Sequence, residues 1–308
     1  MKIISNTTEF HIEEKTAVAI GKFDGIHKGH RALLKKITDA KALGLKAAVM
    51  TFDPSPAVFF GLADDRQLTT KEEKRAVLKS LGVDYLVEYP MTTESAAVEP
   101  EAFISEFLVR KMNASYIAAG ADLSYGRRGM GDFALLEKMQ AAYGYRCEMI
   151  DKIREDGVEV SSTLIRRFIE QGEVVKAAAF LGDFYRIQGT VVHGDHRGRK
   201  MGMPTINITP DREKILPVNG VYYSKIVIGP DVFCGITNIG KKPTVQDSDV
   251  INAETYIYDF SGNLYETAVE VLLVDFRRGE RKFATLEDLK AQMLLDIESG
   301  KNFFGINA

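Results

Sequence analysis

The 308-residue sequence has few cysteines and no excess of basic over acidic residues. It contains only two cysteines, Cys147 and Cys234, which lie far apart and form no CxxC pair or Cys/His cluster. This spacing disfavours a disulfide framework and a structural zinc site, and it suits a reducing compartment. The net charge of -3 provides no basic excess to neutralise a phosphate backbone, so we expect no nucleic-acid partner.

Long apolar runs are also missing. Residues 1–16 lack the apolar core of a signal peptide, and no other stretch is long and apolar enough to span a bilayer. We therefore expect a cytoplasmic protein without membrane contact. The sequence has no internal repeat and no low-complexity tract, and its 45% apolar and 27% charged residues are typical of globular domains.

A chain of 308 residues exceeds what one hydrophobic core usually serves, which favours two domains. In the first half, short apolar runs alternate with patterns of helical period, as in parallel βαβ units. The predicted strands are 16–20, 45–52, 83–89, 115–120 and 145–150, and the predicted helices are 31–43, 71–81, 100–112 and 132–143. This pattern predicts an α/β domain with a Rossmann-like parallel sheet, whose ligands bind at the carboxyl ends of the strands.

The second half has a different texture. A helix pair is predicted between residues 161 and 181, followed by β-rich runs broken by Gly, Pro and Asn. The predicted strands are 185–193, 221–228, 232–239, 253–260 and 266–276. Without helices between them, they indicate a small antiparallel barrel, closed by a terminal helix that starts near Thr285. We therefore place the two domains at residues 1–182 and 183–308.

The segment from Gly21 to His30 follows an apolar strand and opens a helix, where backbone N–H groups and the helix dipole favour a phosphate. Its glycines match neither the GxGxxG fingerprint nor the P-loop, which disfavours hydride transfer and P-loop chemistry. His27 and His30 are separated by Lys28 and by Gly29, which lets the backbone approach a ligand closely. Both imidazoles can donate hydrogen bonds to a polyphosphate and stabilise its transition-state charge. The alternative is a helix start that carries two surface histidines.

The His-x-Gly-His stretch resembles the signature of the nucleotidyltransferase superfamily. With Phe23-Asp24-Gly25 it is similar to the bacterial bifunctional riboflavin kinase/FMN adenylyltransferase family, also called FAD synthetase. Residues 51–56 resemble the second motif of that family, and residues 160–166 its ISSTxIR motif, although alone the latter would suit a plain helix cap. The resemblance implies catalytic roles for His27 and His30 and ATP contacts from Gly21, Phe23, Asp24, Gly25, Gly29, Ser162, Thr163 and Arg166. It implies flavin contacts from Asp53, Pro54, Pro56, Asp122 and Tyr125.

The first half departs from the family at residues 120–126, where the usual motif is GxDFxFG. Leu123 replaces the first aromatic residue and Tyr125 the second. Replacing a ring by leucine removes a stacking surface worth about a kcal/mol, which affects the flavin or adenine side of the pocket more than the phosphate side. Arg127 and Arg128 in the following loop could hold a phosphate as a fork or form a solvated basic turn.

In the second half, residues 189–207 combine glycines, which permit tight turns around a polyanion, with threonine and asparagine oxygens that can hold Mg²⁺. The stretch resembles the riboflavin kinase module, which usually ends in PTAN, although Ile206 replaces the alanine. The resemblance implies ATP contacts from Gly194, Gly198 and Arg199, and metal ligation by Thr205 and Asn207. A hairpin loop with incidental polar residues is the alternative.

Residues 217–222, 237–244 and 278–283 match the same module. The resemblance makes Glu254 the catalytic base, which suits the chemistry because a primary hydroxyl must lose its proton as it attacks the γ-phosphate. A solvent-facing strand residue is the alternative. The resemblance also implies flavin contacts from Thr237, Asn238, Arg278 and Glu280.

One departure in this half affects a turn. The family commonly has Leu-Tyr-Gly where this chain has Leu264, Tyr265 and Glu266. If φ is positive at Glu266, the lost glycine strains the turn by about a kcal/mol or more. If φ at Glu266 is negative, the missing glycine does not strain the turn.

Taken together, the motifs imply an enzyme that phosphorylates riboflavin to FMN with ATP and Mg²⁺, and then transfers AMP from a second ATP to FMN, releasing FAD and pyrophosphate. Leu123 and Glu266 keep two alternatives open: a paralogue with only one activity, and a flavin-binding regulator without turnover. The latter would not need a base such as Glu254. A homo-oligomer is compatible with the sequence.

Overall fold

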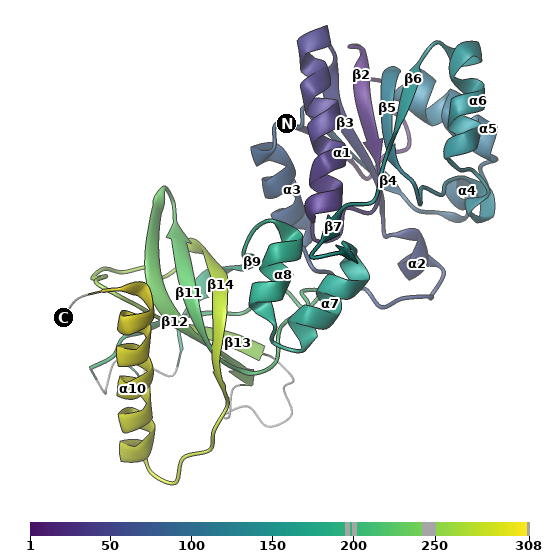
Figure 1. The fold of residues 1–308 in the computed structure, drawn as a ribbon. Helices are drawn as coiled ribbons and strands as arrows, with labels where there is room; N and C mark the ends of the chain where they lie inside the picture. The colour runs from purple at the N-terminus through teal and green to yellow at the C-terminus, as the bar shows by residue number, and fades with distance from the viewer. Residues whose placement is uncertain (195–197, 199–201, 242–250, 307–308) are drawn as a thin grey trace. The chain divides into compact units, whose positions relative to one another are not determined.

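The computed structural model describes residues 1–194, 198, 202–241 and 251–306. The chain divides into two compact units, Met1–Ser162 and Thr163–Ala308, and each is described by itself (Figure 1). Among the described residues, no helix combines the length and the apolar character needed to cross a membrane.

The first unit is built on a six-stranded parallel sheet with the order β1-β4-β3-β2-β5-β6. Its strands are β1 (Lys2–Ser5), β2 (Thr16–Ile20), β3 (Lys46–Asp53), β4 (Tyr85–Pro90), β5 (Ala114–Gly120) and β6 (Arg146–Ile150). The α/β prediction is confirmed, and all five predicted strands are present. Only β1 was not predicted, because this short edge strand is half exposed and shows no clear alternation.

Helices cover both faces of this sheet (Figure 1). Ala17 and Ala19 of β2 pack with α1 and α3, whereas Val18 and Ile20 pack on the opposite face with η2 and α6. The helices are α1 (Lys28–Asp39), α2 (Pro56–Phe59), α3 (Lys71–Ser80), α4 (Thr93–Ala96), α5 (Pro100–Ala102), the π-helical η2 (Phe103–Lys111) and α6 (Phe133–Tyr143). Short turns η1 (Ala40–Leu43) and η3 (Arg127–Gly129) and a small hairpin of β7 (Arg154–Glu155) and β8 (Val158–Glu159) complete the unit.

The second unit begins with α7 (Ser162–Glu170) and α8 (Val174–Leu181), which confirm the predicted helix pair. Six antiparallel strands then close a barrel in the order β10-β13-β12-β11-β14-β9. They are β9 (Tyr185–Val192), β10 (Thr205–Ile208), β11 (Gly220–Ile228), β12 (Asp231–Lys241), β13 (Ile251–Ile257) and β14 (Ala268–Gly279). The barrel prediction is confirmed. The four-residue β10 was not predicted as a strand because it is too short to show alternation.

The terminal helix α10 (Leu286–Phe304) starts at its Thr285 cap, whose hydroxyl accepts a hydrogen bond from the Asp288 amide. Its second half packs on the barrel, where the Tyr258 hydroxyl donates to the Ile297 carbonyl at 2.7 Å. Leu286, the first residue of the helix, is 64% exposed. The helix is therefore buried along its C-terminal half only, and apolar side chains remain open elsewhere on its surface.

The helix α8 packs against β9 and β14, with Val174, Ala177, Phe180 and Leu181 buried. The boundary between the two compact units accordingly follows Ser162 in the chain, whereas the expected boundary follows Gly182. We expect a fragment of residues 183–308 to fold and to make FMN, because the barrel and α10 form a core of their own. Residues 163–308 should unfold at a temperature several degrees higher, since this fragment retains the apolar contacts of α8. Thermal unfolding measures the stability of each fragment, and an assay of FMN formation measures its activity. An insoluble 183–308 fragment beside an active 163–308 fragment would move the boundary to Ser162.

The turn before β14 meets the condition for strain. Glu266 is exposed and has a φ of 65°, in the left-handed region that favours glycine. We expect Glu266→Gly to raise the unfolding free energy by about 0.5–1 kcal/mol, because glycine relieves the strain. The greater entropy of the unfolded glycine variant offsets part of this gain. Urea unfolding measures this change. Thr267→Gly is the matched control: its φ is not positive, so the same test should show destabilisation. Equal destabilisation by both variants would contradict the strain.

Candidate active sites

The loop between β2 and α1 carries three left-handed residues. Phe23 has a φ of 51°, Gly25 of 86° and Ile26 of 43°. For residues other than glycine, this conformation costs roughly 1–3 kcal/mol and persists only where the surroundings enforce it. The side chains of Phe23 and Ile26 are fully buried in the core between the sheet and α1. Packing therefore holds the loop in a strained shape that sets the positions of the histidines.

Asp24 fixes the same loop through hydrogen bonds. Its buried carboxylate accepts from the Leu68 amide at 2.8 Å, and its carbonyl accepts from the Ser162 hydroxyl at 2.8 Å. A Cβ atom at Gly21 would lie 3.2 Å from the Phe23 ring, so any side chain at this position would crowd the ring. The expected ATP contacts Asp24 and Ser162 thus join one another at the carboxyl end of β2.

The two histidines lie together at the start of α1. The His27 Nδ1 accepts from the His30 amide at 3.3 Å and caps the helix, and the two rings stack with centroids 3.7 Å apart. An ideal Cβ on Gly29 would lie 3.2 Å from the His27 ring, which shows why a glycine suits this position. Since Nδ1 of His27 accepts, a neutral ring carries its proton on Nε2 and can donate it to a ligand.

Burial keeps both imidazoles neutral. It lowers the pKa of His27 to about 4, against the opposing charges of Asp24 and Asp122. Burial also lowers the pKa of His30 well below its ordinary value, helped by repulsion from His27 and Lys74. The Nδ1 atom of His30 is buried and has no hydrogen-bond partner among the described residues. Such an unpaired group is costly, and a phosphate oxygen would satisfy it.

This burial predicts a pH-dependent stability. The unfolded chain binds a proton at His27 below its ordinary pKa of 6.5, but the folded chain does so only near 4, so acid favours unfolding. The contribution is complete above pH 6.5 and is lost as the pH falls toward 4, by about 3 kcal/mol for His27. We expect His27→Gln to flatten the pH dependence of urea unfolding over this range. An unchanged slope in the variant would contradict the assignment.

The remaining predicted residues of this unit differ in accessibility. Asp53 ends β3 and forms an ion pair with Lys71 of α3. Pro54, Pro56 and Asp122 are exposed. Tyr125 is 3% exposed, its ring lies 5.1 Å from that of Phe103 in the core, and its hydroxyl donates to the Asp132 carbonyl. Its expected flavin contact stays a prediction.

Two of the expected ATP contacts lie on α7 and belong to the second unit: Thr163 is exposed and Arg166 is half-buried. Arg199, a third, lies outside the described residues.

In the second unit, three strands place polar side chains in one row. Asn207 of β10 and Asn238 of β12 both stand opposite Glu254 of β13. Because Ala253 and Thr255 are fully buried in the barrel, Glu254 and its neighbours face outward. The Thr205 hydroxyl donates to the Glu254 Oε1 at 2.6 Å. The expected base and both expected metal ligands thus lie on one outer surface. We call the row formed by Thr205, Asn207, Asn238 and Glu254 the polar row.

Gly194 and Gly198 lie directly against this row. A Cβ at Gly194 would overlap the Asn207 amide, and a Cβ at Gly198 would overlap the Met203 carbonyl and crowd Thr205. Only glycine fits at these two positions without a shift. Backbone amides close to the row are suited to phosphate oxygens.

The oxygens of the row fit Mg²⁺. The Asn207 Oδ1 accepts from the Asn252 Nδ2 at 2.6 Å, and the Asn252 Oδ1 is buried without a partner among the described residues. Hard oxygen donors suit Mg²⁺, which usually takes few protein ligands and completes its shell with phosphates and water. The described residues hold no cluster of three His, Cys, Asp or Glu side chains, so Thr205 and Asn207 remain the proposed ligands. Sequence reasoning missed Asn252, although it lies two residues before Glu254 on the same strand face.

Two predicted flavin contacts have other partners. Thr237 is fully buried inside the barrel, in a hydroxyl chain with Ser224 and Thr255 at 2.8 Å on each side. Its expected flavin contact stays a prediction. Arg278 forms a two-pronged ion pair with Asp296 and so ties α10 to β14. Both residues stabilise the unit in this structure.

Glu280 follows β14 and reaches β12. Its carboxylate lies against Gly240 and accepts a hydrogen bond from the Asn219 amide at 3.1 Å. Gly240 shares its strand face with Asn238 of the polar row, so Glu280 is exposed beside that row.

A groove of about 690 Å³ opens between the barrel and α10. It is lined by Gly202, Met203, Tyr256, Ala291, Leu294, Leu295, Ile297, Glu298 and Lys301. Tyr256 stands opposite Thr205 and shares its strand face with Glu254, so the groove lies next to the polar row. Its volume and largely apolar lining suit a ring system of flavin size. Sequence reasoning missed this groove.

Comparisons with known proteins identify the families that the two parts of the chain resemble. A FAD synthetase family model matches residues 9–164, and a riboflavin kinase family model matches residues 181–304. The bifunctional riboflavin kinase/FMN adenylyltransferases of Listeria monocytogenes and Escherichia coli K12 are each 36% identical to this chain. The matches cover 97% of the chain and 95% of the Listeria protein, and 96% of the chain and 94% of the E. coli protein. A solved structure from Streptococcus pneumoniae, titled a macrolide-efflux protein, is 28% identical with a TM-score of 0.85 over 98% of each chain.

Proposed function

The chain belongs to the family of bifunctional riboflavin kinase/FMN adenylyltransferases, and from this we propose that it makes FMN from riboflavin and FAD from FMN. One observation supports the proposal above others: the chain carries two chemically distinct phosphate sites. The stacked His27/His30 pair suits adenylyl transfer in the first unit. The polar row around Glu254 suits phosphoryl transfer to a hydroxyl in the second.

For the kinase step, we place the flavin ring in the groove beside α10 and its ribityl hydroxyl at Glu254. The Thr205 hydroxyl occupies one carboxylate oxygen of Glu254, which leaves the other to take the proton from the attacking hydroxyl. The ribityl oxygen forms a bond to the γ-phosphorus of ATP as the bond between the γ-phosphorus and the β-phosphate oxygen breaks, and ADP leaves. Thr205 and Asn207 would hold Mg²⁺, which when bound would offset the negative charge of the phosphates.

For adenylyl transfer, the FMN phosphate attacks the α-phosphorus of ATP, and pyrophosphate leaves. The nucleophile is already ionised, so the protein needs no base and contributes position and electrostatic stabilisation. His27 and His30 donate N–H groups to the triphosphate. Ser162, Thr163 and Arg166 are proposed as further phosphate contacts.

Incubation with riboflavin, ATP and Mg²⁺, followed by chromatographic separation of the flavins, tests the function. Both FMN and FAD should form, and FMN supplied alone with ATP and Mg²⁺ should give FAD. Chelation of Mg²⁺ should abolish FMN formation. A single product would favour the alternative of one lost activity, and flavin binding without any product would favour a regulator.

A further inference from the structure

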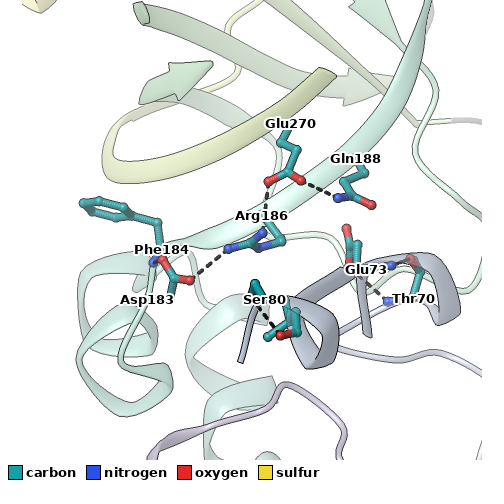
Figure 2. Close-up of polar contacts among 9 residues, drawn as sticks. Thr70, Glu73, Ser80, Asp183, Phe184, Arg186, Gln188 and Glu270 are labelled. Atoms are coloured by element: carbon teal, nitrogen blue, oxygen red, sulfur yellow. Dashed lines mark hydrogen bonds and ion pairs between the residues drawn. The ribbon is translucent and has the colours of Figure 1, made fainter. Parts of the chain in front are cut away.

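Lys74 is a buried cation beside the histidine pair. It lies in the first turn of α3, directly after Thr70 and Glu73, which form a capping box (Figure 2). Its side chain is 8% exposed, and its Nζ donates to the Lys22 carbonyl at 3.3 Å. Lys22 begins the strained loop that leads to His27. The ammonium group therefore lies at the carboxyl end of β2, next to the candidate phosphate site.

The carboxylates around Lys74 are engaged with other donors. Asp24 accepts from the Leu68 amide, Glu88 accepts two bonds from the Arg75 guanidinium, and Asp53 pairs with Lys71. An ammonium group has three N–H donors, and the described residues provide one acceptor for it, the Lys22 carbonyl at the long end of hydrogen-bond distances. Two donors thus remain without an acceptor in a buried place.

The loop that contains Lys22 leads into α1, which carries a second group without a hydrogen-bond partner among the described residues. The Nδ1 of His30 is buried without a partner among the described residues, and the Lys74 charge acts on this ring. Burial lowers the pKa of Lys74, while the fields of Asp24, Glu88 and Asp53 oppose the shift. Leaving a cation and an imidazole nitrogen unpaired is unfavourable unless a ligand completes them. A polyanion matches the positive charge of Lys74, and its oxygens can accept hydrogen bonds from the ammonium group and from a His30 Nδ1 that carries the ring proton.

We propose that Lys74 is a phosphate-binding residue of the adenylyl-transfer site, contacting the polyphosphate of ATP and the pyrophosphate product. The inference rests on the proposed adenylyl transfer and adds a third group to the two histidines. The competing role is purely structural: Lys74 would only hold the Lys22 carbonyl and thereby the loop.

The reverse reaction isolates this site from the kinase. Pyrophosphate attacks the adenylyl phosphorus of FAD, the bond to the FMN phosphate breaks, and ATP and FMN form. We expect Lys74→Met to raise the KM for pyrophosphate, and the KM for ATP in the forward direction, by about tenfold to a hundredfold. The KM for FMN and the rate of riboflavin phosphorylation by the same chain should stay near the parental values. Lys79→Met is the matched control, since Lys79 lies on the same helix and is exposed.

Lys74→Gln separates binding from loop support, because glutamine can still donate to the Lys22 carbonyl but carries no charge. If Lys74 binds phosphate, the glutamine variant behaves like the methionine variant and its thermal unfolding is unchanged. Recovery of the parental KM values by glutamine, or unchanged KM values for ATP and pyrophosphate in Lys74→Met, would overturn the proposal. A parental chain that makes neither FAD from FMN nor ATP from FAD and pyrophosphate would instead refute the proposed function.

Discussion

His30→Ala is expected to slow FAD formation from FMN by about a hundredfold to a thousandfold, while FMN formation from riboflavin stays close to the parental rate. The magnitude follows from the loss of one preorganised donor to a developing phosphate charge, worth about 3–4 kcal/mol of barrier. The geometry supports a large effect because the His30 ring stacks on His27 and carries a buried nitrogen that no described residue satisfies. Initial rates of the two half-reactions, measured separately on the same preparation, provide the test.

His11→Ala is a suitable control for this variant. His11 is exposed, and its ring nitrogen contacts the Arg110 carbonyl away from the strained loop. It should leave both rates unchanged. Equal loss of both activities in His30→Ala would show that the two sites are not independent, and an unchanged rate of FAD formation would remove His30 from the mechanism.

Glu254→Gln is expected to slow riboflavin phosphorylation by about a hundredfold or more, because glutamine keeps the size of the side chain but cannot accept the substrate proton. Its amide oxygen can still accept the hydrogen bond that Thr205 donates at 2.6 Å, so the polar row should keep its shape. Riboflavin binding should change little. The variant supplied with FMN should make FAD at close to the parental rate, since adenylyl transfer uses neither this residue nor a protein base.

Glu270→Gln provides the matched control on the same barrel. The Glu270 carboxylate pairs with Arg186 at 3.0 Å and accepts from Gln188 at 2.5 Å (Figure 2), so its substitution disturbs a structural pair without touching the polar row. If Glu254 mainly orients Mg²⁺, raising the Mg²⁺ concentration should restore much of the lost rate. An unchanged rate in Glu254→Gln would refute the base assignment. Glu280, which lies near the row, and Asp259 would then be the next candidates.

The outcome for individual residues shows where sequence reasoning holds. Strands β2 to β6 were predictable because each is a short apolar run between helical patterns. Glu254, Thr205 and Asn207 were identified by resemblance, and strand pairing places them together. Glu266 was identified as strained if its φ were positive, and its φ of 65° meets that condition.

Other residues could not be placed in this way. Tyr125 and Thr237 lie in motifs that suggest ligand contact, yet both are buried, one in the sheet core and one in the barrel interior. A motif specifies residue types and their spacing but not which face of a strand or loop receives solvent. That assignment depends on contacts with segments distant in the chain, such as η2 for Tyr125.

The sequence by itself determined the two-domain α/β and β-barrel organisation, the histidine pair at a helix start and the oxygen-rich segment of the kinase module. These features depend on local period and residue type, which neighbouring positions express directly. Only the tertiary structure decided that the Lys74 ammonium group reaches the Lys22 carbonyl in the loop before His27, that Asn252 adjoins Asn207, and that α10 leaves a groove next to Glu254. The physical reason is that each of these juxtapositions joins residues far apart in sequence through packing and strand pairing, and no local pattern records such contacts.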